Sequence, residues 1–382
     1  MMKKLRDLLT ILLFCGFLAV FSVLFLLLPA KPFSETENRP LQTAPAVSPE
    51  TILSGTLADQ TNLWFSDQFP LRDGFVRLKS AFELLLCKGE NNGVLYSDSQ
   101  LAVRAFDAYD SRLHIAENAD WYFAPTVKAQ LKRYGDLVGQ LSVPVVTLIP
   151  PRTVDVADSA FPYDRPYGDG LYDLLSEVLP EKAGYLELLP DLRAAYERGE
   201  YVIYRTDHHW TTLGAYTAYQ KVASALGIEE VSPEETWSKS EIPDFFGTTA
   251  ARASFPWGKP DVITLYDDGE NYTVTADGET LDGLYDFRRA RSSDKYTVFL
   301  GGTHGITTVK GNGDDRKTLL VFKDSFADSL IPFLAHHFDI VALDLKTHPD
   351  LTAAIGEYHP EAVLVVYNAE NLITNAAFGN LR

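Results

Sequence analysis

The stretch TLLVFKDSFADSLIPFLAHHFDIVALDLKTHPDLTAAIGEYHPEAVLVVY (318–367) decides the fold class of this chain. It contains three short, unbroken apolar runs, which are typical of strands buried on both faces, and these are separated by segments with helical periodicity. Strands that alternate with helices predict a parallel sheet with right-handed crossovers, so we expect an α/β fold. The expected strands are 318–322, 339–345 and 362–367, and the expected helices are 326–336 and 351–358.

The chain before this stretch contributes further elements. VPVVTLI (143–149) has the composition of another buried strand, and YVIY (201–204) predicts a strand that runs directly into a polar loop. Residues 254–300 are rich in Gly, Asp, Tyr and Thr with alternating apolar positions, which predicts hairpins in a peripheral β-insertion. The other expected elements are a helical region over 50–86 broken at 68–70, a hairpin over 93–104, helices over 117–141, 170–179 and 213–226, and a short strand over 185–189.

The N-terminus predicts a membrane anchor. Residues 8–28, LLTILLFCGFLAVFSVLFLLL, carry no charge, and about 20 apolar residues suffice to span a bilayer. Lys3, Lys4 and Arg6 precede them, so the positive-inside rule places the N-terminus in the cytoplasm and the rest of the chain outside. Because no small-x-small cleavage site follows, we expect an uncleaved, single-pass signal anchor in the cell membrane rather than a removed signal peptide. The expected division is a cytoplasmic stub (1–7), a membrane span (8–28), a Pro-rich linker (29–49) and an extracytoplasmic domain (50–382).

The composition is that of an acidic globular protein. Of the 382 residues, 46% are hydrophobic and 23% are charged, and the formal net charge is −18. These fractions exclude a wholly disordered chain, and an acidic chain gains nothing from counterion release, so nucleic-acid binding is not expected. The two cysteines, Cys15 and Cys87, are too few for a disulfide framework.

Two polar loops carry the candidate chemistry. Ser325, in KDSF (323–326), stands at the junction of an expected strand and an expected helix, where the carboxyl edge of a sheet exposes its hydroxyl. The helix start beside it offers backbone N–H groups to a developing oxyanion. A nucleophilic serine needs a base that a carboxylate orients. Asp207 and His209 in TDHHW (206–210) supply both, since residues i and i+2 of an extended segment point to the same side.

Other interpretations of these loops stay open at this point. Ser325 could serve only as a helix N-cap, which is a common role for serine. The run Asp-His-His (207–209) could bind a metal ion, and the pair His336-His337 could complete such a site. Histidine at a helix C-terminus also satisfies carbonyl groups without any further function.

Two aromatic side chains are candidates for substrate binding. His304, in GGTHG (301–305), could approach a substrate from a flexible loop, and its alternative is a surface turn. Trp210 could form a platform for a sugar ring, and its alternative is packing in the core.

The motifs resemble those of the DHHW protein family of bacterial envelopes, which is similar to the alginate O-acetyltransferases of the AlgJ/AlgX type with their SGNH-hydrolase-like domain. The clearest match is TDHHWTTLGAY (206–216). Further matches extend along most of the chain after the expected anchor, and they are SETENRPL (34–41), DQFPLRD (67–73), DFFGT (244–248), FLGGTHG (299–305) and FKDSFADSLIPFL (322–334).

The resemblance implies a three-layer SGNH-like domain with a parallel sheet. It implies that Ser325 is the nucleophile, and that Asp207 and His209 are the Asp-x-His pair, with His208 in the variable middle position. The Asp-x-His block precedes the serine block here, as in the alginate type, where the order is described as a circular permutation of the SGNH fold.

The resemblance also indicates groups for the oxyanion. The amides of Ser325 and Phe326 are physically reasonable donors. Gly247 and Asn368 are further candidates, because SGNH enzymes use a Gly and an Asn from separate loops. Lys323 stands where a GDS block has its glycine, so this part of the pattern departs from ordinary SGNH hydrolases.

The expected activity is the transfer of an O-acyl group, above all acetyl, onto an extracytoplasmic polysaccharide through an acyl-serine intermediate. Since acetyl-CoA is absent outside the membrane, the resemblance implies a membrane-bound O-acyltransferase as the partner that passes the acyl group across. No metal and no other cofactor is expected. The alternatives are a carbohydrate esterase with the same triad, which uses water as the acceptor, and a non-catalytic protein that binds glycan or scaffolds a complex.

Overall fold

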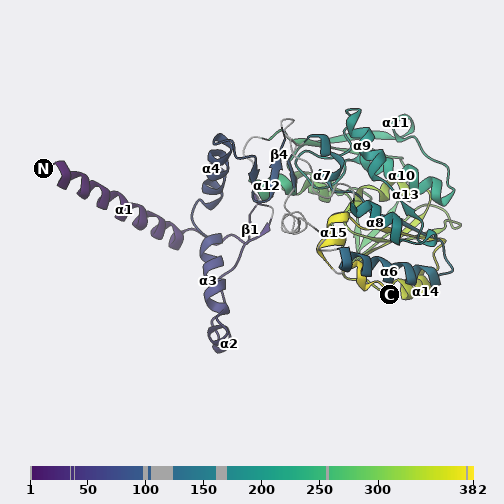
Figure 1. Cartoon of the computed structure of the whole chain (residues 1–382), viewed down its shortest axis with the longest axis horizontal. Coiled ribbons are helices and arrows are strands. Elements are labelled where there is room, and N and C mark those ends of the chain that lie inside the picture. Colours follow the sequence, from purple (N-terminus) through teal and green to yellow (C-terminus); the bar gives the residue numbers. More distant parts are fainter. Residues whose placement is uncertain are drawn as a thin grey trace. The chain divides into compact units, whose positions relative to one another are not determined.

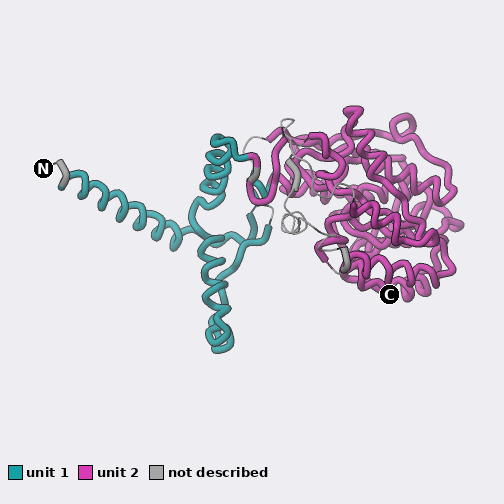
Figure 2. The backbone as a smooth tube through the Cα atoms, in the orientation of Figure 1, with its two compact units in different colours: residues 1–88, 251–257 teal, residues 89–250, 258–382 magenta. Residues whose placement is uncertain are grey.

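The computed structural model describes residues 2–34, 36–37, 39–97, 102–104, 124–160, 170–254, 258–375 and 377–382. The chain divides into two compact units, 1–88 with 251–257 (unit 1) and 89–250 with 258–382 (unit 2), which Figure 2 distinguishes by colour. Unit 2 contains the large sheet and both polar loops, and unit 1 contains the apolar N-terminal helix. Residues 50–88 group with the N-terminal helix in this division, and the expected extracytoplasmic domain over 50–382 stays a prediction.

An eight-stranded mixed sheet forms the framework of unit 2, in the order β11-β10-β12-β14-β13-β15-β6-β7 (Figure 1). Neighbours from β14 to β7 are parallel, which confirms the α/β class. The bounds are β6 Val145–Leu148, β7 Tyr185–Leu186, β10 Thr273–Ala276, β11 Glu279–Leu281, β12 Ile306–Lys310, β13 Thr318–Lys323, β14 Asp339–Asp344 and β15 Ala362–Val366.

The expectation of a parallel sheet is wrong at one edge. Strand β12 is antiparallel to β14, and β10 and β11 continue in the antiparallel sense. Only residues 311–317 connect β12 to β13, which is too short for the crossover of about a dozen residues that a parallel connection requires. The β10–β11 hairpin closes through Asp277-Gly278, both with positive φ, as a two-residue hairpin turn demands.

The β-rich stretch expected over 254–300 is thus divided between two sheets. Strands β10 and β11 extend the large sheet, whereas β9 (Asp261–Asp267) pairs with β8 (Ser238–Phe245) in a separate two-stranded sheet. Residues 255–257 of that stretch lie outside the described chain. A third sheet consists of β3 (Glu90–Asn91), β4 (Val94–Tyr96) and β5 (Ala102–Arg104), and residues 98–101 of the expected hairpin are not described.

Helices of unit 2 pack in two groups, α6 with α8 and α10 with α9 and α13. Figure 1 shows α6 near α8, and α10 near α9 and α13. Residues 117–123 of the helix expected over 117–141 lie outside the described chain. The bounds are α6 Ala124–Gln140, α7 Thr153–Val156, α8 Gly170–Val178, α9 Leu189–Glu197, α10 Thr212–Leu226, α11 Pro233–Thr236, α12 Thr248–Ala253, α13 Ile331–Ala335, α14 Leu351–Tyr358 and α15 Ala369–Thr374.

Two expected elements are shorter than the sequence pattern indicates. The strand expected over 201–204 is reduced to a single bridge between Ile203 and Trp210. The helix expected over 326–336 is a 3₁₀-helix, Ser325–Ser329, followed by α13. Pro332 near the start of α13 has no N–H for a preceding turn, so a continuous α-helix through this point is disfavoured.

Strands β13 and β15 lie at the centre of the core. Residues 319–322 of β13 and 363–366 of β15 have no exposed surface. Burial on both faces explains why these runs are continuously apolar rather than alternating. The loops that follow them are therefore held by the most rigid part of the sheet, and one of these loops carries Ser325.

Unit 1 consists of helices around a short hairpin. Its α1 (Met2–Leu27) is the one helix in the described chain that is long and apolar enough to cross a membrane, over Lys4–Leu27. Within the expected Pro-rich linker (29–49), β1 (Phe33–Ser34) and β2 (Arg39–Pro40) pair with each other. Arg39 Nη2 binds Asp67 Oδ1 at 2.6 Å, which ties this hairpin to the helices. The helices are α2 Pro49–Leu53, α3 Thr56–Asp67 and α4 Arg72–Leu85.

Candidate active site

Ser325 lies directly after β13, at the first position of the 3₁₀-helix, and its side chain is partly exposed. The preceding Asp324 caps this turn, since its Oδ1 accepts the Phe326 N–H at 3.0 Å. Its Oδ2 accepts the backbone N–H of Asn368 at 2.7 Å and the Asn371 Nδ2–H at 2.8 Å. Asp324 thereby ties the serine loop to the loop after β15, which limits the freedom of Ser325.

The structure brings Ser325, His209 and Asp207 together. His209 Nε2 lies 2.8 Å from Ser325 Oγ, and His209 Nδ1 lies 2.5 Å from Asp207 Oδ1. A carboxylate can only accept, so Nδ1 carries the proton and the lone pair of Nε2 faces the serine hydroxyl. This tautomer and orientation are what a general base for a serine requires.

Asp207 is fully enclosed by donors. Its Oδ1 also accepts the backbone N–H of His209 at 3.0 Å, and its Oδ2 accepts from Thr248 N at 2.7 Å and from Thr248 Oγ1 at 3.0 Å. Burial alone would raise the pKa of Asp207, but the charges and hydrogen bonds of His209 and His208 outweigh it and hold the pKa well below its usual range. The carboxylate therefore stays ionised and keeps the His209 ring in place.

Gly247 makes this enclosure possible. A Cβ atom at this position would lie 2.2 Å from Asp207 Cβ and 2.3 Å from Asp207 Oδ2, so only glycine allows the backbone so close. The Gly247 N–H donates to Thr206 Oγ1 at 3.1 Å rather than facing the serine. This geometry gives no support to its expected role in the oxyanion hole, and the contact that Gly247 makes instead leaves space for the Asp207 carboxylate.

The other expected oxyanion donors are also engaged elsewhere. The Phe326 N–H is occupied by Asp324, and Asn368 Nδ2 donates to Pro150 O at 3.2 Å while its Oδ1 caps α15 through Glu370 N. The backbone N–H of Ser325 has no acceptor among the described residues, so it is the donor that this arrangement leaves available. The oxyanion roles of Phe326 and Asn368 therefore find no support in this geometry.

Two aromatic side chains, Tyr296 and Trp210, pack against the residues of the site. The Tyr296 ring stacks on the His209 ring, with centroids 3.8 Å apart and planes 7° from parallel, and its hydroxyl donates to Ser325 O at 3.2 Å. Trp210 Nε1 donates to Phe326 O at 3.1 Å and to Ser329 Oγ at 2.9 Å. Trp210 is only 2% exposed, so its side chain is packed in the interior and offers no open face to a sugar ring.

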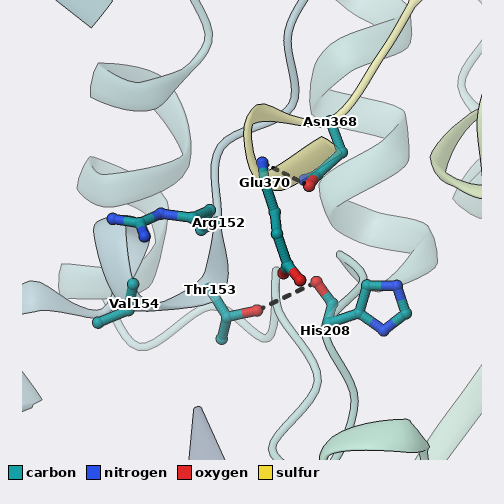
Figure 3. A pocket seen from close by; sticks show the side chains of 6 residues that line it. All are labelled: Arg152, Thr153, Val154, His208, Asn368 and Glu370. Carbon is teal, nitrogen blue, oxygen red and sulfur yellow. Dashed lines mark hydrogen bonds between the residues drawn. The ribbon is translucent and has the colours of Figure 1, made fainter. Parts of the chain in front are cut away.

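His208 occupies a position beside the triad rather than in it. Its Nδ1 lies 2.6 Å from Thr248 Oγ1, whose only proton goes to Asp207, so Nδ1 must donate and Nε2 is left as an acceptor. Figure 3 shows His208 at the edge of a small pocket of about 10 Å³, which is room for about one water molecule. The pocket is lined by Arg152, Thr153, Val154, His208, Asn368 and Glu370.

His304 is not brought to this site by any described contact. Its Nδ1 lies 3.3 Å from Asp277 Oδ2, at the turn of the β10–β11 hairpin. Asp277 also accepts the N–H of Ile306 at 3.0 Å. The surface-turn interpretation of His304 therefore fits the structure better than a role in substrate binding.

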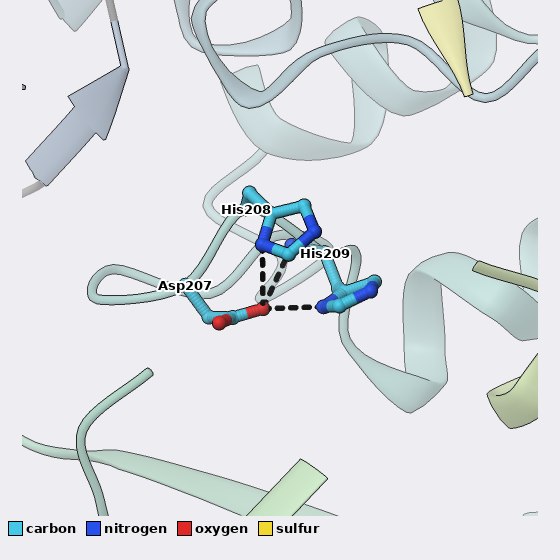
Figure 4. A group of neighbouring side chains, drawn as sticks. All are labelled: Asp207, His208 and His209. Atoms are coloured by element: carbon cyan, nitrogen blue, oxygen red, sulfur yellow. Dashed lines mark hydrogen bonds and ion pairs between the residues drawn. The ribbon is translucent and has the colours of Figure 1, made fainter. Parts of the chain in front are cut away.

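Asp207, His208 and His209 do form a group whose potential metal ligands lie within 4.8 Å of one another (Figure 4). The atoms of Asp207 and His209 already have hydrogen-bonding partners, however: both Asp207 oxygens accept from donors, and His209 Nε2 faces Ser325. An ion here would have to displace these bonds. The arrangement therefore suits an acid–base relay better than a metal centre.

The pair His336-His337 does not complete that group. His336 Nδ1 lies 2.9 Å from Asp268 Oδ2, and His337 Nε2 lies 2.8 Å from the Tyr219 hydroxyl. Both rings are thus engaged with partners of their own beside α13. These contacts fit the interpretation in which His336 and His337 have no metal-binding function.

His337 is expected to make stability depend on pH. Burial, with smaller effects of His336 and Arg316, lowers the pKa of His337 to about 4. Between pH 6.5 and 4 the unfolded chain binds a proton that the folded chain does not, so stability should fall as the pH drops through this window. We expect a loss of about 1–2 kcal/mol, discounted for the half-exposed ring.

Thermal unfolding of the wild type and of His337→Gln at neutral pH and at about pH 4.5 measures this effect. Glutamine can still accept from Tyr219 but does not titrate, so its melting temperature should fall less on acidification. An equal fall in both proteins would contradict the assignment.

Several residues that hold the site were missed by the sequence analysis. Asp261 accepts from the N–H of Thr206 at 2.7 Å and from its Oγ1 at 2.5 Å, and so fixes the start of the Asp207 loop. Thr248 and Tyr296 contact Asp207 and His209 directly. Thr248 stands in the quoted DFFGT motif and could have been found there, whereas nothing local marks Tyr296 or Asp261.

Residues 185–343 match the family model described as DHHW protein. The resemblance drawn from the motifs is thereby confirmed. The matched segment of this chain contains both polar loops, and it also contains Gly247 and Tyr296. No curated protein matches the chain.

Solved structures share the fold of this chain. A DHHW family protein from Eubacterium siraeum superimposes with a TM-score of 0.59 at 21% identity, over 76% of this chain and 95% of that chain. Bacillus cereus PatB1 with a sulfonyl adduct gives 0.60 at 19% identity, over 76% of this chain and 100% of that chain. The O-acetyltransferase domain of Pseudomonas putida AlgJ is more distant, with a TM-score of 0.47 at 17% identity over 76% and 99%. At these identities the first two likenesses establish the common fold.

Proposed function

We propose that this protein is a membrane-anchored serine O-acyltransferase that transfers an acyl group, above all acetyl, to a polysaccharide outside the cytoplasm. The observation that carries the proposal is the continuous chain of contacts from Asp207 through His209 to Ser325 Oγ. A cap, a packing role or a structural histidine would not require a buried, ionised carboxylate behind a ring whose free nitrogen faces a partly exposed hydroxyl.

In the proposed reaction, Ser325 Oγ attacks the carbonyl carbon of an acyl donor while His209 Nε2 takes the hydroxyl proton. Asp207 holds the ring and stabilises the imidazolium that forms. The Ser325 N–H would donate to the oxyanion, and the leaving group departs with the proton from His209. A sugar hydroxyl, deprotonated by the same His209, then attacks the acyl-serine and regenerates the enzyme.

The surroundings of this reaction are part of the proposal. The apolar α1 would cross the cell membrane once with the N-terminus inside, which leaves the serine site outside the cytoplasm. A membrane-bound O-acyltransferase would supply the acyl group there. The SGNH-like character of the domain, with its reversed order of motifs, belongs to the same proposal and is supported by the order of Asp207, His209 and Ser325 along the chain.

A sulfonyl fluoride tests the nucleophile directly, and the sulfonyl adduct carried by a PatB1 structure of the same fold suggests this probe. We expect the full chain, held in detergent micelles, to gain one sulfonyl group on the peptide that contains Ser325. Ser325→Ala should abolish the adduct. Ser224→Ala, which removes an exposed hydroxyl from α10, should leave it unchanged. No adduct, or an adduct that survives Ser325→Ala, would favour the non-catalytic glycan-binding alternative.

The acceptor separates transfer from hydrolysis. With an acetyl ester as donor and a neutral oligosaccharide present, a transferase forms the acetylated sugar, whereas an esterase forms acetate at a rate that the sugar does not change. Both outcomes require Ser325. Activity that a chelator abolishes and that survives Ser325→Ala would instead indicate a metal-dependent site at Asp207, His208 and His209.

A further inference from the structure

An apolar stripe runs along one face of α4, and its side chains stay largely exposed although Phe75 contacts Phe21 and Phe69. It consists of Leu71, Phe75, Leu78, Phe82 and Leu85, which follow one another at intervals of four and three positions and so lie on one face of the helix. Their exposed fractions are 65%, 42%, 66%, 59% and 77%. Five large apolar side chains in one row are unusual on a surface that only water covers.

The opposite side of α4 is used for polar contacts. Arg72 Nη1 binds Glu37 Oε2 at 2.5 Å, and Ser34 Oγ lies 3.3 Å from Asp73 Oδ1. Ser80 is buried and donates to Ala253 O at 3.1 Å. These bonds fix the rotation of α4 about its axis, so the apolar stripe faces outward as a consequence of the fold rather than of a loose helix.

The stripe is continuous with the expected membrane span. Phe75, its second member, lies against Phe21 of α1, with ring centroids 5.7 Å apart. Phe69, between α3 and α4, stacks on the same Phe21 ring at 5.3 Å. Phe21 lies within the Lys4–Leu27 segment that is apolar enough to cross a membrane. The apolar surface of α1 therefore continues without a break onto α4.

Helix α3 meets α1 in the same way. Phe25 of α1 contacts Trp64 and Phe65 of α3, both with centroids 5.2 Å away. Leu63 and Phe65 are 58% and 50% exposed beside this contact. Figure 2 shows α3 and α4 running across the C-terminal end of α1 within unit 1. Tryptophan at the end of a span is typical of the boundary between lipid and water.

We propose that the α4 stripe, with Leu63 and Phe65 of α3, lies in the outer boundary of the bilayer that α1 crosses, with lipid acyl chains as its occupant. An amphipathic helix with an apolar face and a charged opposite face binds at this depth, parallel to the membrane plane. The aromatic contacts with Phe21 and Phe25 hold α3 and α4 at the level where the span ends. This inference rests on the proposed membrane anchoring and is independent of the proposed chemistry.

The test uses the full chain with an environment-sensitive nitrobenzoxadiazole label on single cysteines. The stripe is labelled in Leu78→Cys and its polar neighbour in Lys79→Cys, both with Cys15 and Cys87 replaced by serine. The native Cys15 of α1, in a chain with Cys87→Ser, reports on the anchor. Each protein is reconstituted into phosphatidylcholine vesicles, and quenching by acyl-chain bromine and by aqueous iodide is measured.

We expect the labels at positions 15 and 78 to be quenched by bromine, with quenching at 78 at least about threefold stronger than at 79, and the label at 79 to be quenched by iodide. Iodide quenching at 78 with bromine quenching at 15 would overturn the lipid contact while the anchor stands. Shielding of 78 from both quenchers would overturn it in favour of a protein partner or a second copy. Iodide quenching at 15 would overturn the anchoring and this inference together.

Discussion

His209→Ala is expected to lower the rate of acylation of Ser325 by roughly 10⁴-fold or more, because the serine loses the base that takes its proton. The 2.8 Å contact between His209 Nε2 and Ser325 Oγ is the only described contact that offers the hydroxyl a basic nitrogen. The measurement is the second-order rate constant for labelling by the sulfonyl fluoride, together with the rate of acetyl-ester turnover. Removal of the imidazole ring also removes the stacking contact with Tyr296 and could lower stability. The melting temperature of the variant should therefore be measured together with its activity.

The neighbouring histidine supplies a matched control. His208 bonds to Thr248 and lies in the same loop, yet no described contact joins it to Ser325. His208→Ala should therefore cost far less activity than His209→Ala. If the two variants lost activity equally while both remained folded, the assignment of His209 as the base would be wrong.

Gly247→Ala is expected to disable the site although Gly247 does not touch the serine. The added methyl group would have to occupy space held by Asp207, at 2.2 Å from its Cβ. A clash of this size costs about 1–3 kcal/mol in a close-packed interior, and an ångström of displacement in a catalytic group lowers the rate roughly 10²-fold. Both the melting temperature and the turnover rate should fall.

A second glycine tests whether this effect is local. Gly356 is exposed on α14 and a Cβ there meets nothing within 4 Å, so Gly356→Ala should keep full activity. Alanine in an exposed helix is preferred over glycine by about 0.5–1 kcal/mol, so this variant should be slightly more stable. Wild-type turnover and stability in Gly247→Ala would show that the Asp207 pocket tolerates the methyl group, which would contradict its proposed role.

The residues of the proposed relay could be predicted because their signals are local. A serine at the end of an apolar run and the i, i+2 spacing of Asp207 and His209 depend only on neighbouring positions. The α/β class followed from the alternation over 318–367 for the same reason, since the period of apolar residues is written in the chain. The hairpins expected over 254–300 rest on the alternation of apolar residues, and the structure contains one of them, β10–β11.

Three of the expected oxyanion donors, the amides of Phe326 and Gly247 and the side chain of Asn368, are engaged with other groups, which the sequence alone does not show. Nothing in the sequence shows that Asp324 takes the Phe326 N–H or that Thr206 takes the Gly247 N–H. Buried polar groups form hydrogen bonds with whichever partners the fold brings near them. A backbone N–H that has no partner among its neighbours in the sequence is therefore often bonded to a group from a distant segment. The two interpretations of Trp210 stayed open in the sequence for the same reason, because its burial depends on Phe326 and Ser329.

By itself the sequence determined the class of fold, the apolar N-terminal helix and the three side chains that could form a relay, since each rests on composition or on the spacing of neighbours. Only the tertiary structure decided that His209 and Ser325, 116 positions apart, meet, that Gly247 leaves room for Asp207, and that the stripe on α4 joins the surface of α1. These are contacts between distant segments, and they exist only once the core has fixed where each loop and helix must lie.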